Sequence, residues 1–140
     1  MIRFLVFALV AAVLAVVIPS DAMAQKKTKV EVTQKWNGSV EDEKATKPDV
    51  ITSAKGLEAA WKAWKATGDV PKVDFDKNII VAAYSVGSRL TITGAQLDDA
   101  GNLQVLAISS ADFGTGFRYV LGVVSKEGVK TVNKKELPKE

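Results

Sequence analysis

The spacing of apolar residues near the start of the chain predicts one strand and one amphipathic helix. Val30 and Val32 alternate with polar residues, which is typical of a strand. Asn37-Gly38 follows and predicts a hairpin turn. The stretch TSAKGLEAAWKAWKATGD predicts a helix whose N-cap is Ser53, or alternatively Thr52, and whose C-terminal cap is Gly68.

Apolar residues of this helix recur at positions i, i+3, i+4 and i+7, and they therefore form one face. We expect this face to contact a sheet, because tryptophans at helical spacing usually lie in a core. An alternative interpretation is that Trp61 and Trp64 form a platform for a sugar. The residues expected in the core are Leu57, Trp61, Trp64, Ile80 and Ala82.

The rest of the chain is a series of strand patterns joined by short turns. The apolar run from Ile79 to Val86 predicts a strand covered on both faces. Alternation resumes at Leu90 and changes phase at Gly94, which predicts a β-bulge. A turn at residues 98–102 and another at 126–128 separate the strands expected at residues 103–108, 117–125 and 129–132. The fold class is therefore α+β, an antiparallel β-sheet meander with one amphipathic helix packed on one face.

The N-terminus has the pattern of a secretory signal peptide. Arg3 precedes an apolar run at residues 4–18, and Ala22-Met23-Ala24 is a cleavage motif of the A-x-A type. We expect residues 1–24 to be removed and residues 25–140 to form one α+β domain, with flexible ends at 25–29 and 134–140. This predicts a bacterial protein exported to the periplasm or secreted, without a membrane span after cleavage. The alternative is an uncleaved anchor, although the run is short for one.

Composition argues against most catalytic classes. The chain has no histidine and no cysteine, so no Ser-His-Asp triad, Cys-His pair or histidine metal site can form. The net charge of +3 comes from dispersed lysines, without the clustering of nucleic-acid binders. Among the acidic residues, Asp98 and Asp99 fit a turn, and Asp74 and Asp76 lack the further ligands of a calcium loop. We therefore expect no enzyme activity, no cofactor, no metal and no nucleic-acid partner.

The most distinctive stretch is SSADFGTGFRYVLGVV, residues 109–124, in which a loop with Gly114, Gly116, three aromatics and an arginine runs into a strand. Arg89 and Arg118 are the only arginines after the N-terminal pattern, and both adjoin glycine-containing loops. Their planar guanidinium groups could converge on an anion. Alternatively, Arg118 pairs with Asp112 and the glycines only permit the corner. The candidate contact residues are Arg89, Asp112, Phe113, Gly114, Gly116, Phe117, Arg118 and Tyr119.

Three stretches, VDFDKNIIVAAYSVG, LTITGAQLDDAGNLQV and FRYVLGVVSKEG, resemble the C-terminal domain of the PrcB protease-complex family. The resemblance covers about residues 49–138. Gly87-Ser88-Arg89-Leu90 and Phe117-Arg118-Tyr119 depart from the Gly-Gly-Tyr-like and Pro-Tyr stretches usual in that family. The resemblance implies a small exported partner module without catalytic residues.

These observations together predict a non-catalytic module that binds another envelope or secreted protein, such as a protease. Sheet edges and the loop at residues 109–119 are the expected contact surface. The alternative is a module that binds a small anionic ligand or a glycan with the same loop. A minor hydrolase is a third interpretation, since Ser and Lys are abundant.

Overall fold

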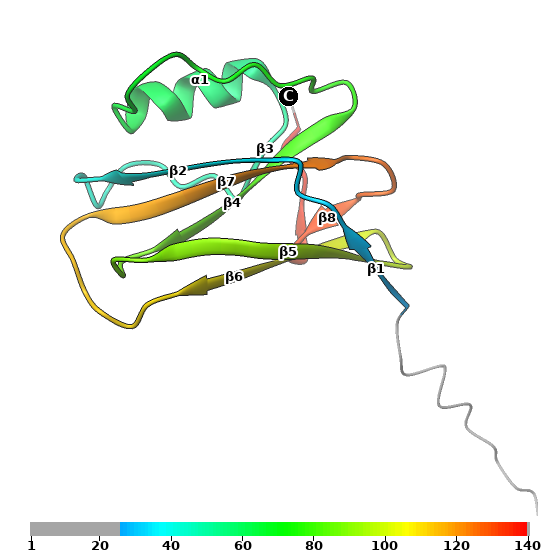
Figure 1. Cartoon of the computed structure of the whole chain (residues 1–140). Helices are drawn as coiled ribbons and strands as arrows, with labels where there is room; N and C mark the ends of the chain where they lie inside the picture. The colour runs from blue at the N-terminus through cyan, green and yellow to red at the C-terminus, as the bar shows by residue number, and fades with distance from the viewer. Residues whose placement is uncertain (1–25, 140) are drawn as a thin grey trace, which may run out of the picture.

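The computed structural model describes residues 26–139, which form two β-sheets and one helix in three layers (Figure 1). The predicted signal peptide lies outside the described residues. The helix-side sheet has the strand order β2-β7-β4-β3 and the outer sheet the order β1-β5-β6-β8-β9. The elements are β1 (Lys27–Val30), β2 (Gln34–Val40), β3 (Val50–Ile51), α1 (Ala54–Ala63), β4 (Asn78–Ser85), β5 (Leu90–Asp98), β6 (Asn102–Ser109), β7 (Phe117–Ser125), β8 (Thr131–Val132) and β9 (Lys135–Glu136).

The α+β class with a single helix on an antiparallel sheet is confirmed, but the strands do not run as one meander. β4 pairs with β7 rather than with its neighbour in sequence, β5. β5 and β6 form a hairpin in the outer sheet, with the predicted bulge between Ile92 and Gly94. The chain changes sheets four times, between β1 and β2, between β4 and β5, between β6 and β7, and between β7 and β8.

Two apolar clusters explain why the central strands are apolar on both faces. On β7, Tyr119 and Leu121 face the cluster under α1, while Val120 and Val124 face the cluster between the two sheets. β4 divides in the same way, with Ile80 on the helix side and Val81 between the sheets. A strand enclosed by a helix layer and a second sheet has no solvent face, so its sequence has no polar alternation.

The helix begins as expected and ends earlier than expected. The Ser53 side chain caps the N-terminus by accepting a hydrogen bond from the Gly56 amide at 3.0 Å. The predicted end at Gly68 is wrong, because the helix ends at Ala63 in a Schellman motif. In this motif Lys65 adopts a φ of 51° and the Ala66 amide donates to the Trp61 carbonyl at 3.0 Å.

Several other local predictions are wrong for non-local reasons. Asn37 and Gly38 lie inside β2, where Gly38 leaves room for the ring of Tyr119. The strand expected at residues 129–132 corresponds to β8. It does not form a hairpin with β7, because it pairs in parallel with β6. The two ends expected to be flexible contain strands, β1 at one end and β9 at the other.

Candidate functional site

The predicted contact loop lies beside the β4–β5 loop at one end of the molecule, on the left in Figure 1. We call residues 86–89 and 110–116 the paired loops. The Gly114 amide donates to the Val86 carbonyl at 3.0 Å, and the Ser110 amide donates to the Arg89 carbonyl at 3.0 Å. The Arg89 amide in turn donates to the Ser110 hydroxyl at 3.0 Å. Backbone hydrogen bonds therefore hold these two loops as one surface.

Asp112 is the polar centre of the paired loops. Its carboxylate accepts a hydrogen bond from the Ser88 amide at 3.1 Å. Hydrogen bonds from the hydroxyls of Ser110 and Ser88, and from that amide, hold the pKa of Asp112 well below its usual range. A carboxylate with a lowered pKa is a weak base, so this cluster ties loops together rather than removing protons.

We expect Asp112→Ala to raise the hydrogen-exchange rate of the Ser88 amide several-fold, because its acceptor is removed. Asp112→Asn is the matched control, since it keeps an oxygen acceptor. The lowered pKa of Asp112 means that its stabilisation is complete above the usual carboxyl value of about 3.9 and is lost only as pH falls through the lowered value. Protection factors of the native loops that fall between pH 7 and pH 5 would contradict this assignment.

The candidate contact residues divide between surface and core. Phe113 is 89% exposed, and Val86 and Ile108 nearby are 50% and 63% exposed. They are the exposed large hydrophobic residues of the part of the chain that the structure describes. Phe117 and Tyr119, predicted as contact residues, are instead buried at 3% and 4% exposure, because they project from β7 toward the helix.

The two arginines do not share a hollow. Arg89 lines a shallow depression with Leu90 and Ile108, and Arg118 is not part of that depression. Arg118 lies on β7 between Ser39 of β2 and Ser85 of β4. Within residues 26–139 neither arginine forms an ion pair, so the expected Arg118–Asp112 pair is also absent from this part of the chain. Gly116 does permit the corner, with a φ of +70° and close approach to the Val40 carbonyl.

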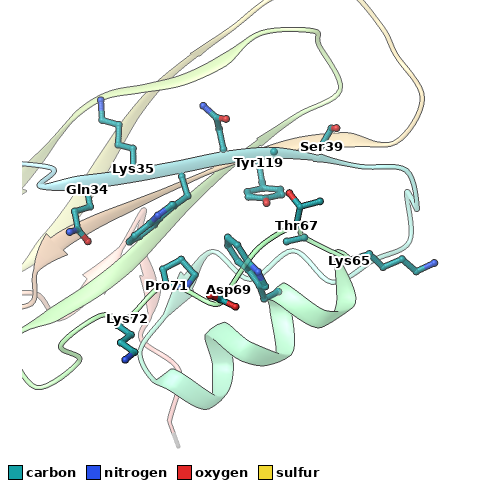
Figure 2. Close-up of a pocket in the computed structure, with 14 residues that line it drawn as sticks. Gln34, Lys35, Ser39, Lys65, Thr67, Asp69, Pro71, Lys72 and Tyr119 are labelled. Atoms are coloured by element: carbon teal, nitrogen blue, oxygen red, sulfur yellow. The ribbon is translucent and has the colours of Figure 1, made fainter.

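A larger concavity, which sequence reasoning missed, lies between β2 and the end of α1 (Figure 2). We call it the β2 groove. Its volume is about 890 Å³, within the range of ligand-binding clefts. Its lining residues are Gln34, Lys35, Trp36, Asn37, Gly38, Ser39, Trp61, Lys65, Ala66, Thr67, Asp69, Pro71, Lys72 and Tyr119.

Three aromatic side chains from three different elements meet in the β2 groove: Trp36 from β2, Trp61 from α1 and Tyr119 from β7. The core assignment of Trp61 is therefore wrong in part. Trp61 is half-buried, lines the groove and donates its indole N–H to the Gly68 carbonyl at 3.2 Å. The other residues expected in the core, Leu57, Trp64, Ile80 and Ala82, are buried. One sequence signal for the groove existed, since Lys65, Ala66, Thr67 and Asp69, which line it, follow Trp61 within eight positions.

The polar groups of the β2 groove suit binding. Burial raises the pKa of the Tyr119 hydroxyl, so this group stays protonated and can donate a hydrogen bond at neutral pH. Asp69 is the one carboxylate among the lining residues, whereas carboxylate acid–base catalysis needs two. Residues 26–139 contain no cluster of three acidic side chains that could hold a metal ion. No helix in the same range is long and apolar enough to cross a membrane.

Comparison of the whole chain with known protein families, with curated proteins and with solved structures finds no match.

Proposed function

We propose that this protein is a non-catalytic binding module that contacts another exported protein through the paired loops. The observation that carries the proposal is the exposure of Phe113 and Val86 on two loops held together by hydrogen bonds, with Ile108 exposed at the end of β6 that leads into one of these loops. Exposed apolar side chains that gather in one place mark interaction surfaces, whereas single ones are ordinary.

The composition of the patch favours a protein partner over a small molecule. Phe113 is an exposed aromatic side chain on a loop that is otherwise mostly polar, and aromatic residues are enriched at protein interfaces. Arg89 is exposed beside the patch and can form a hydrogen-bonded contact at its rim. The hollow at Arg89 is shallow and lacks the second arginine that an anion site of this kind would use.

The resemblance to the PrcB protease-complex family supports a protease as the kind of partner. The N-terminal signal pattern supports an encounter outside the cytoplasm, in the periplasm or beyond the cell. Both statements are part of the proposal, and both are tested by the identity of the captured protein.

We expect Phe113→Ser to weaken partner binding by about 10- to 100-fold, because burying a phenylalanine side chain contributes roughly 1.5–3 kcal/mol. The measurement is co-purification from the host with the tagged full chain, followed by quantification of the captured protein. Glu127→Ser is the control, since Glu127 is exposed in the turn that follows the opposite end of β7. Equal recovery of the same protein by wild type and Phe113→Ser would refute the assignment of this surface.

A further inference from the structure

The β2 groove runs along the free edge of a sheet. β2 pairs with β7 on one side, and it ends the strand order of the helix-side sheet in the part of the chain that the structure describes. Six consecutive residues, Gln34 to Ser39, line the groove. Successive side chains of a strand point to opposite faces, so a groove lined by every residue in turn is bordered by the backbone itself.

Figure 2 shows this arrangement directly. Lys35 and Ser39 project from β2 away from the helix, whereas Gln34 projects toward it, as does Tyr119 from β7 behind. The wall shared by Gln34, Lys35 and Ser39 is the backbone edge of β2. Backbone N–H and C=O groups on the outer edge of a strand are a template for pairing with another chain.

The opposite wall adds apolar and charged contacts. Trp61 comes from the last turn of α1, and Lys65 and Lys72 belong to the segment that follows the helix. These two lysines line the groove with two ammonium groups, against the single carboxylate of Asp69. The ammonium of Lys35 points away from the helix and donates to the Ile92 carbonyl at 2.9 Å. The surroundings of the groove are therefore cationic, and an acidic occupant has complementary charge.

We propose that the β2 groove binds an extended acidic peptide segment of a partner protein, which adds to the helix-side sheet as a strand beside β2. The pairing supplies backbone hydrogen bonds, and alternate side chains of the segment enter the groove against Trp36 and Trp61. Six residues in extended conformation span about 20 Å. This site lies on the helix side of the molecule and does not depend on binding at the paired loops.

An extended peptide fits these observations better than a glycan does. A strand edge repeats its donors and acceptors every two residues, which matches the spacing of another extended backbone. The aromatic side chains alone would suit either occupant. A peptide and a glycan can be distinguished by experiment, because N-methylation removes backbone donors that only a peptide has.

The test uses a blocked hexapeptide that alternates valine and glutamate, added to the isotope-labelled protein while amide chemical shifts are recorded. We expect shifts at Gln34–Ser39 and quenching of tryptophan fluorescence. Two methylated peptides serve as matched probes, one with N-methyl groups on the valines and the other on the glutamates. Because alternate amides of a strand point to opposite edges, only one of the two should lose binding, by at least tenfold.

Protein variants complete the design. The double variant Lys65→Glu, Lys72→Glu should weaken the peptide about tenfold and reverse the preference in favour of a valine–lysine peptide. Phe113→Ser at the paired loops should bind the peptide as wild type does, which separates this site from the proposed function. Equal effects of the two methylated peptides, or no shifts at β2 with millimolar peptide, would overturn the proposal. Shifts at β2 caused by a neutral oligosaccharide but not by the peptide would assign the groove to a glycan instead.

Discussion

Gly116→Ala should lower the free energy of unfolding by about 3 kcal/mol or more, a large effect for one methyl group at a surface loop. The new Cβ would collide with the carbonyl oxygen of Val40 and lie 2.9 Å from the Cα of Glu41. Both are backbone atoms of the adjoining strand and loop, so neither can rotate away. The φ of +70° adds a conformational cost for any L-residue with a side chain.

Gly114→Ala is the matched control in the same loop. Its Cβ would lie 3.5 Å from the Val86 carbonyl oxygen, which is an ordinary contact, and its φ is not in the left-handed region. We therefore expect a change within about 0.5 kcal/mol. Urea denaturation followed by circular dichroism measures both variants. Similar losses of unfolding free energy in the two variants would mean that any added side chain in this loop is destabilising, and that the close approach to Val40 is not the cause.

Trp64→Ala should be the most damaging change in the core, at about 3–5 kcal/mol. Trp64 is 3% exposed and stacks on Tyr119 with a centroid distance of 4.4 Å. Its ring also meets Phe117 and Tyr84 edge to face. The indole N–H donates to the Thr46 carbonyl at 2.7 Å, so the loop before β3 would also lose an anchor.

Two variants separate the parts of this effect. Trp64→Phe keeps an aromatic ring but removes the indole donor, and we expect it to cost about 1–3 kcal/mol. Trp61→Ala removes a half-buried ring from the groove wall and should cost less than Trp64→Ala. Thermal unfolding should show Trp64→Ala as the largest decrease, roughly 10–20 °C for a domain of this size. A decrease for Trp61→Ala equal to that for Trp64→Ala would contradict the assignment of only one of them to the core.

Features with a local cause could be predicted from the sequence. The observed bounds of β7, Phe117–Ser125, match the apolar run that predicts it, and the bulge at Gly94 follows from a change of phase. The Ser53 cap depends on a side chain and an amide three positions apart. Each of these features depends only on residues that are close together in the sequence, so the sequence is sufficient to predict it.

Features with distant partners could not be predicted. Asn37-Gly38 has the composition of a turn, yet the glycine is required by the ring of Tyr119 on the adjoining strand. The parallel pairing of β8 with β6 is stabilised by the Asn102 side chain, which accepts hydrogen bonds from the Thr131 hydroxyl and the Lys134 amide. The β2 groove combines residues of β2, α1 and β7, and no stretch of sequence contains them together.

The place of β7 in the chain has a kinetic consequence. β7 lies between β2 and β4, and the residue that precedes β2, Thr33, contacts Val123 of β7, which is 90 positions away. Until a ribosome has synthesised β7, β2 has no neighbour and α1 has no complete sheet to cover. Non-local pairing of this kind places folding in the range of milliseconds to seconds. In the nascent chain β2 therefore stays unpaired until β7 has been made, and truncation before Phe117 leaves no native helix-side sheet.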